Sequence, residues 1–195
     1  MRAVIVCLFA LLLAPSAFAQ PVYFLVDASK SMNQDEQDEA AAFVKAEKAK
    51  LAEGTPTSTT PFGSMENGGS DCGEVTINPP RAIVEDIPEQ YTRGDFTPVA
   101  SALRAALKEA ATNGGRVIVV SDGADTCERD VCEEVRSHLR RNPKGRRPEF
   151  KPVGANDDIV DTYGCFVSAR GGEQHGLISG LPPPPEKTDH LWWVI

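Results

Sequence analysis

The chain lacks several patterns that mark common functional classes. It has only three histidines among 195 residues, and none of them lies in a nucleophile motif. No G-x-S-x-G sequence occurs, which argues against a serine hydrolase. Basic residues are in the minority, since 20 Lys and Arg face 28 Asp and Glu for a formal net charge of -8. An acidic surface of this size argues against nucleic acid or an anionic membrane as the partner, and is compatible with binding cations.

Long apolar runs are also absent, apart from one at the amino terminus. Arg2 precedes an apolar run of 12 residues, 3–14, and Ala17-Phe18-Ala19 matches the small-x-small rule for signal peptidase. Twelve residues rise only ~18 Å as a helix, too short for a ~30 Å hydrocarbon core. We therefore predict a signal peptide over residues 1–19, cleaved before Gln20, a secreted or periplasmic protein, and no transmembrane segment after cleavage.

Cysteines are few, and their number fits export. Beyond the signal peptide there are four, Cys72, Cys127, Cys132 and Cys165. An even number in an exported chain predicts two disulfides, with three possible connectivities. Cys127 and Cys132 are close enough in sequence to close one loop, which would leave Cys72 to pair with Cys165. The alternative, a zinc site, would require tighter C-x-x-C pairs or interleaved histidines, and neither is present.

Two short runs are apolar at every position, and each is followed by an acidic residue. These are Val22–Val26, before Asp27, and Val117–Val120, before Ser121-Asp122. Continuous apolar runs are typical of strands covered on both faces. Their alternation with helical patterns predicts an α/β fold with a doubly wound, mostly parallel sheet flanked by helices. We expect helices over 34–53, 99–112, 130–141 and 159–169, and weaker strands over 149–153 and 176–179.

The remaining segments are less regular. Residues 57–60 and 74–77 could be short strands, and Asn67-Gly68-Gly69-Ser70 between them is typical turn chemistry, so we predict a hairpin at one edge of the sheet. Residues 81–92 are expected to form a loop or a short helix. The domain is predicted to span 20–180, followed by a Pro-rich and apolar tail, 181–195. The end of that tail either packs on the domain or docks on a partner.

Oxygen-bearing side chains follow both apolar runs. Asp27, Ser29 and Ser31 form a D-x-S-x-S pattern after the first, Asp122 follows the second, and Thr97 precedes a proline at the start of a helix. Carboxylate and hydroxyl oxygens are hard ligands that suit Mg²⁺, Mn²⁺ or Ca²⁺. Taken singly, a Ser or Thr before a helix is usually a cap, and an Asp after a strand is often a turn residue. The joint order of all five predicts a metal site.

Three segments resemble a von Willebrand factor A domain that has a complete metal-ion-dependent adhesion site. They are VDASKSM (26–32), FTPVASAL (96–103) and VVSDGADTC (119–127). The sequence is similar to the bacterial branch that resembles calcium-activated chloride channel regulators, in which S-D-G is followed by a TC…C pair, here 126–132. The resemblance covers about Val22 to Gly172 and implies a vWA-type, Rossmann-like fold.

The resemblance also implies a role for each residue of the site. Ser29 and Ser31 would ligate the metal directly, and Thr97 would do so directly or through water. Asp27 and Asp122 would act mainly through water. An open coordination position would take an acidic residue from a protein partner, because a divalent ion with only two carboxylates nearby still attracts a third.

Two other functional classes, an enzyme and a scaffold domain, are alternatives to a metal-dependent binding domain. A phosphotransferase with an aspartyl nucleophile would need a second Asp two places after Asp27, where Ser29 stands. A metal-free or metal-stabilised scaffold domain is the main alternative, and a hydrolase is a weaker one. We therefore predict a binding protein and no enzymatic activity.

Overall fold

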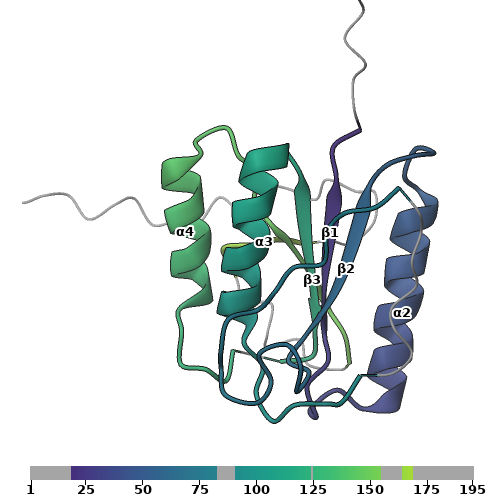
Figure 1. Ribbon diagram of the computed structural model, residues 1–195, viewed down its shortest axis with the longest axis vertical. Coiled ribbons are helices and arrows are strands. Elements are labelled where there is room, and N and C mark those ends of the chain that lie inside the picture. Colours follow the sequence, from purple (N-terminus) through teal and green to yellow (C-terminus); the bar gives the residue numbers. More distant parts are fainter. Residues whose placement is uncertain (1–18, 83–90, 124, 155–163, 169–195) are drawn as a thin grey trace, which may run out of the picture.

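The computed structural model describes residues 19–82, 91–123, 125–154 and 164–168. Its centre is a five-stranded sheet of order β2-β1-β3-β4-β5, in which every pair of neighbours is parallel (Figure 1). The predicted α/β fold with a parallel sheet flanked by helices is confirmed. The strands are β1 (Val22–Asp27), β2 (Thr57–Phe62), β3 (Arg116–Ser121), β4 (Glu149–Pro152) and β5 (Val167–Ser168), and the helices are α2 (Gln34–Ala49), α3 (Val99–Asn113) and α4 (Val131–Arg141).

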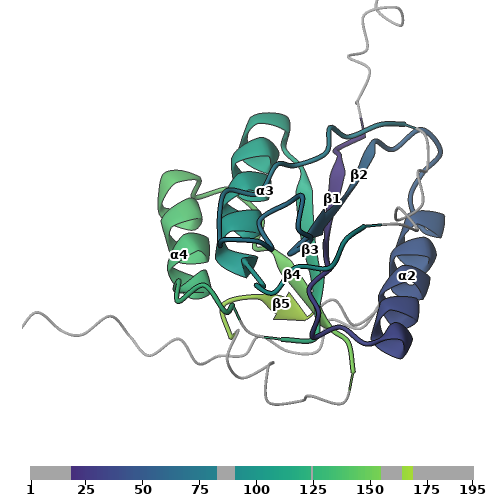
Figure 2. The ribbon, with the colours of Figure 1, turned by 60° about the horizontal axis from the view of Figure 1, so that its bottom comes forward.

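Helices cover both faces of the sheet, as the views in Figures 1 and 2 show. Successive side chains of β1 point to opposite faces. Tyr23 and Leu25 therefore pack in the cluster that includes α3 and α4, whereas Phe24 and Val26 pack in the cluster that includes α2. All four are at most 2% exposed. The burial of both faces explains why this strand is apolar at every position before its final Asp27.

The order of the strands reverses between β1 and β3. The chain passes from β1 outward to β2, and then returns across the sheet to β3 on the other side of β1. Ligands of open α/β sheets bind outside the carboxyl ends of the strands at such a reversal. Asp27 is the last residue of β1, and Asp122 directly follows β3. The topology thus brings the two predicted acidic residues to one edge of the sheet.

Local sequence determines where the helices begin and end. α2 begins at a capping box in which the Asn33 side chain and the Glu36 side chain each accept a backbone N–H. It ends at Ala49, earlier than the predicted residue 53. The N–H groups of Lys50 and Leu51 bond to carbonyls only three residues back, which tightens the last turn and ends the helix. α3 ends at Asn113, and its cap residue Gly114 has the left-handed conformation that favours glycine.

The predicted hairpin of 57–60 and 74–77 is wrong. β2 pairs in parallel with β1, beginning with Thr57 opposite Val22, and extends through Pro61 to Phe62. A proline is tolerated there because β2 is an edge strand. Residues 74–78 are not a named strand, and Asn78 is joined to β2 through side chains, since its N–H donates to Oγ1 of Thr60. The turn residues at 67–70 therefore indicate a local bend in the chain, and they do not identify the strand with which β2 pairs.

The predicted helix over 159–169 is wrong at its carboxyl end. Residues Val167 and Ser168 form β5, which pairs with Glu149 and Phe150 of β4. Phe166, just before β5, packs its ring 5.5 Å from the ring of Phe150. Residues 155–163 lie outside the described part of the chain, as do residues 1–18 of the predicted signal peptide (1–19), the predicted strand at 176–179 and the predicted tail at 181–195.

The four cysteines beyond the predicted signal peptide all form disulfides, but the favoured pairing was wrong. The bonds are Cys72–Cys127 and Cys132–Cys165. The helix cap at Asp130 lies between Cys127 and Cys132, so the first belongs to a loop and the second to α4. Two disulfides leave no thiolate for the alternative zinc site, and they suit an extracellular or otherwise oxidising compartment. Among the described helices, none is long and apolar enough to cross a bilayer.

Candidate metal site

The carboxylate of Asp27 is the buried base of the predicted site. The residue is 0% exposed. Its Oδ1 accepts the backbone N–H of Ser29 at 2.9 Å, and its Oδ2 accepts the hydroxyl of Ser121 at 2.5 Å. Burial raises the pKa of Asp27 to about 6, against the lowering effect of these hydrogen bonds. A buried carboxylate held by two donors is fixed in position and gains from a nearby positive charge.

A row of oxygen atoms leads from Asp27 towards the surface. Oγ of Ser29 lies 2.8 Å from Oγ of Ser31, and the Ser31 hydroxyl donates to Oδ1 of Asp122 at 3.0 Å. Burial raises the pKa of Asp122, partly opposed by this hydrogen bond. The structure therefore brings together four of the five predicted residues, Asp27, Ser29, Ser31 and Asp122.

The fifth predicted residue, Thr97, lies on a neighbouring loop and is 3% exposed. That loop is joined to the D-x-S-x-S segment at Gly94, which bridges to Ser29 and accepts the N–H of Lys30 at 2.9 Å. On its other side, the N–H of Thr97 donates to Oγ1 of Thr126 at 2.7 Å, and Thr97 O accepts the N–H of Thr126. Thr97 is thus held between the loops that follow β1 and β3.

Asp125 is a structural residue of the site that the sequence analysis missed. Its Oδ2 accepts the N–H of Ala100 at 2.7 Å, and its Oδ1 accepts the N–H of Cys127 at 2.7 Å. Pro98, the cap residue of α3, has no side-chain hydrogen bond to offer, so Asp125 caps this helix from a distant loop. Asp125 lies within the 119–127 motif, in which only Asp122 was predicted to take part in the site. Ser121, the partner of Asp27, was missed in the same motif.

Three glycines pack backbone against backbone behind the site. A Cβ at Gly94 would lie 2.4 Å from Cα of Gly69 and 2.5 Å from O of Gly63, and one at Gly69 would lie 2.1 Å from O of Gly63. The N–H of Gly94 donates to O of Gly63 at 2.9 Å, and the N–H of Asp95 donates to O of Gly69 at 2.9 Å. This close contact keeps the loop of Thr97 against the D-x-S-x-S segment. From the sequence, Gly69 was predicted only as a turn residue.

The donor set fits a hard divalent cation. Hydroxyl and carboxylate oxygens are the ligands preferred by Mg²⁺, Mn²⁺ and Ca²⁺. Asp27 is buried without a basic partner in its hydrogen bonds, and Asp122 is bonded to a neutral hydroxyl, so both carboxylates would gain from a cation between them. Within the described residues no three His, Cys, Asp or Glu side chains group together as a metal site. The candidate site therefore combines the hydroxyls of Ser29, Ser31 and Thr97 with only two carboxylates.

Comparison with known proteins finds likeness to solved structures and not to families or curated proteins. No family model and no curated protein matches the sequence. Among solved structures, proximal thread matrix protein 1 from the mussel byssus is similar to this chain, with a TM-score of 0.49 and 16% sequence identity. The match covers 68% of this chain and 37% of that one, so the chain spans little more than a third of the mussel protein.

Proposed function

We propose that this protein is an exported von Willebrand factor A domain that binds a divalent cation, and through it a protein partner. The observation that supports the proposal best is the oxygen row at the carboxyl ends of β1 and β3. It joins Ser29, Ser31 and Asp122 by contacts of 2.8 and 3.0 Å, with the Asp27 carboxylate buried behind it. These residues come from two strand ends that the topology places side by side.

The residues would share the work of holding Mg²⁺, or Mn²⁺ or Ca²⁺ in its place. The hydroxyls of Ser29 and Ser31 would be direct ligands, and Thr97 would complete the set directly or through water. Asp27 and Asp122 would balance charge and orient the ligands, since Asp27 already holds the Ser29 backbone. When bound, the cation supplies a positive centre for an acidic side chain of the partner.

The rim of the site suits contact with another protein. Lys30 and Asp95 form an ion pair of 2.6 Å there, and both side chains are at least 60% exposed. Phe96 and Met65 are exposed by 36% and 42%, and they are the large hydrophobic residues exposed in the described part of the chain. Both lie on loops next to the site, because Phe96 precedes Thr97 and the Met65 N–H bonds to Thr92. An acidic residue flanked by apolar side chains would fit this rim.

We propose binding and not catalysis as the activity. His138 is the one histidine among the described residues. It lines a cavity together with Gln20 and Gly115 near the amino ends of the strands, at the edge of the sheet opposite the serines. Among the described residues, no imidazole therefore lies beside Ser29 and Ser31 to act as a general base. The signal peptide predicted over residues 1–19 and the two disulfides support a secreted or periplasmic protein.

Thermal unfolding with and without cations tests the metal site. A cation that binds only the native protein stabilises it, by about 2.7 kcal/mol at 100 times its Kd. We expect Mg²⁺ or Mn²⁺ to raise the Tm of EDTA-treated protein, and Asp122→Asn to abolish the rise. Asp95→Asn is the matched control, because this exposed neighbour of Thr97 is outside the ligand set. An unchanged Tm in wild type would contradict the proposal.

Partner capture tests the second half of the proposal. Tagged wild type and Asp122→Asn are incubated with extract from the native compartment, with Mg²⁺ or with EDTA. We expect a partner that is retained only by wild type and only with Mg²⁺. Equal recovery under all conditions would leave a scaffold domain, the main alternative, as the better account. The Tm measurement separates this outcome from failure of the metal site itself.

A further inference from the structure

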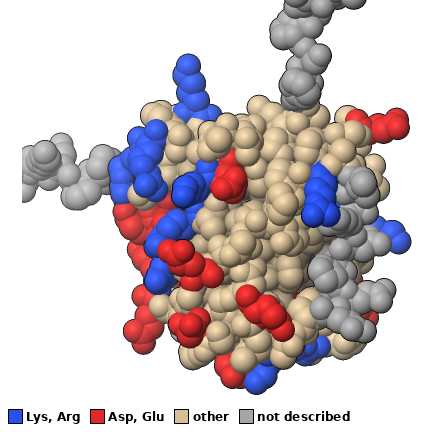
Figure 3. All heavy atoms as spheres, viewed as in Figure 1, with Lys and Arg blue, Asp and Glu red and all other residues tan. Residues whose placement is uncertain are grey.

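Positive charge is concentrated at the end of the molecule opposite the metal site. The segment 136–147 contains six of the 20 Lys and Arg residues and no Asp or Glu, although the chain has a formal net charge of -8. It comprises the last two turns of α4 and the loop that follows. In Figure 3, blue atoms gather over the upper end of α4, and more red atoms lie below them. Net charge therefore does not describe this end of the protein.

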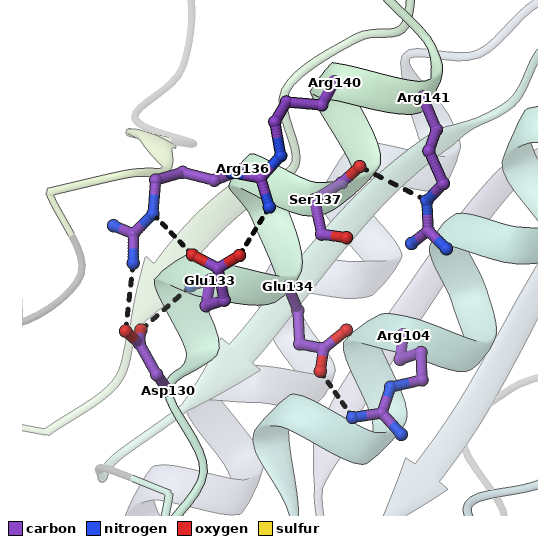
Figure 4. A network of polar contacts seen from close by, with 8 residues as sticks. All are labelled: Arg104, Asp130, Glu133, Glu134, Arg136, Ser137, Arg140 and Arg141. Carbon is purple, nitrogen blue, oxygen red and sulfur yellow. Dashed lines mark hydrogen bonds and ion pairs between the residues drawn. The ribbon is translucent and has the colours of Figure 1, made fainter. Parts of the chain in front are cut away.

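Neighbouring carboxylates neutralise Arg104 on α3 and Arg136 and Arg140 on α4, as Figure 4 shows. Arg136 bonds to Asp130 at 2.9 Å and to Glu133 at 3.0 Å. Arg140 bonds to the other oxygen of Glu133 at 2.5 Å. Arg104, on α3, pairs with a glutamate of α4 in the same way. Carboxylates of the protein itself thus balance the charge of these three arginines.

Within the described ranges, the basic residues from Arg141 to Arg147 have no carboxylate partner. Arg141 donates only to the backbone carbonyl of Ser137, at 3.3 Å (Figure 4). Lys144, Arg146 and Arg147 are exposed, and none forms an ion pair with any residue in the described ranges. Basic residues in the last turn of a helix offset its dipole, which accounts for Arg141. The dipole does not account for the three that follow the helix.

These unpaired charges border a hollow in the surface. A cavity of about 510 Å³ lies between the carboxyl ends of α3 and α4, with Arg141, Lys144 and Arg146 among its lining residues. A second cavity, also of about 510 Å³, shares five lining residues with it, so the two form one groove. Leu107 and the buried His138 line both. Burial lowers the pKa of His138, and Glu134, which also lines the second cavity, is paired with Arg104.

We propose that this basic groove binds a polyanionic polysaccharide, independently of the metal site. A linear chain can lie in a concave groove, whereas a flat bilayer cannot follow it. The exposed hydrophobic residues Met65 and Phe96 lie at the other end of the sheet, so in the described structure the groove has no apolar anchor for a membrane. The lining of both cavities contains no Phe, Tyr or Trp on which nucleic-acid bases would stack. Carboxylate or sulfate groups along a glycan would pair with the free cationic side chains.

Binding of a fluorescent heparin octasaccharide to the oxidised, mature protein tests the proposal. Fluorescence anisotropy is measured at about 50 mM and about 300 mM NaCl, with a neutral dextran oligomer and phosphatidylglycerol vesicles as comparisons. We expect binding of the heparin probe that weakens with salt, no binding of dextran or vesicles, and no effect of EDTA. Binding of the vesicles without binding of heparin would overturn the glycan as ligand.

Two variants with the same change in net charge locate the binding surface. Arg141→Ala/Lys144→Ala/Arg146→Ala removes the groove charges, and we expect the affinity to fall about tenfold, because three exposed charges that would pair with the glycan are lost. The control Lys45→Ala/Lys50→Ala/Arg129→Ala removes three exposed charges elsewhere and should change the affinity less than about twofold. Circular dichroism and Tm confirm that both variants fold. Equal losses in the two, or no binding by wild type at low salt, would contradict the proposal.

Discussion

The hydroxyl of Ser31 donates a hydrogen bond to Oδ1 of Asp122 at 3.0 Å, although 91 residues separate the two along the chain. The contact joins the loop after β1 to the loop after β3, across the point where the order of the strands reverses. Packing of the hydrophobic core alone does not require this hydrogen bond. The proposed cation site depends on it, because it is where the two loops meet.

Ser31→Ala should separate metal binding from folding. Ser31 is exposed, so the loss of its hydrogen bond should cost about 1 kcal/mol or less of folding free energy. The loss of a direct ligand should nevertheless abolish the rise in Tm with Mg²⁺. Ser70→Ala, an exposed serine in a neighbouring loop, should retain the full response. Thermal unfolding with and without Mg²⁺ measures both effects, and a full response in Ser31→Ala would remove this residue from the ligand set.

Asp27→Asn should change how stability depends on pH in the metal-free protein. The folded-state pKa of Asp27 is raised by burial, to about 6 from an ordinary 3.8, so the native state binds more protons than the unfolded state between these values. Stability contributed by this group is therefore present at low pH and is lost as pH rises through about 6. Wild type should lose up to about 3 kcal/mol relative to Asp27→Asn between pH of about 4 and about 7.

Urea unfolding in EDTA across this pH range measures that difference, with other titrating groups cancelling between the two proteins. If the difference in unfolding free energy between wild type and Asp27→Asn does not change with pH, the pKa of Asp27 is not raised in the folded protein. Asp27→Asn should also lose its response to Mg²⁺.

Gly94→Ala should disrupt the site by moving a loop. The added Cβ would lie 2.4 Å from Cα of Gly69, closer than atoms of two backbones can approach, so the loop of Thr97 must shift. We expect a loss of stability of about 1–3 kcal/mol and a loss of the Mg²⁺ response. Gly123→Ala is the matched control, because a Cβ there meets nothing within 4 Å. Equal behaviour of the two variants would contradict the packing account.

Removal of either disulfide should destabilise the protein, but only one should affect the site. The bonds close loops with separations of 55 and 33 residues, so chain entropy predicts a similar loss of about 4 kcal/mol for each. Cys72–Cys127 also anchors the segment in which Asp125 caps α3 and Thr126 holds Thr97. Cys72→Ser/Cys127→Ser should therefore weaken Mn²⁺ binding, and Cys132→Ser/Cys165→Ser should not. Titration of the folded variants with Mn²⁺ decides this.

The sequence predicted well those features that depend on burial and on motifs. β1 and β3 were identified because both faces of a central strand are buried, which makes every position apolar. The oxygen-bearing residues after these strands were identified because parallel strands bring their carboxyl ends to one edge. Asp27, Ser29, Ser31 and Asp122 accordingly meet in the structure.

Features that depend on distant contacts were not predictable in the same way. The parallel pairing of β2 with β1 has no local signal, whereas the turn residues at 67–70 suggested a hairpin that does not form. Cys127 and Cys132 are near in sequence, but a helix begins between them and directs them to different partners. The role of Asp125 was hidden for a similar reason, since the helix that it caps begins 26 residues earlier, at Val99.

Electron paramagnetic resonance of Mn²⁺ added to the oxidised, EDTA-treated and desalted protein tests the central claim most directly. The signal of free Mn²⁺ decreases when the ion is bound, so a titration counts the bound ions. The account predicts one bound Mn²⁺ per wild-type chain, competition by Mg²⁺, and no specific binding by Asp122→Asn, while Asp95→Asn binds as wild type does. An undiminished free-ion signal in wild type, or equal binding by Asp122→Asn, would contradict it.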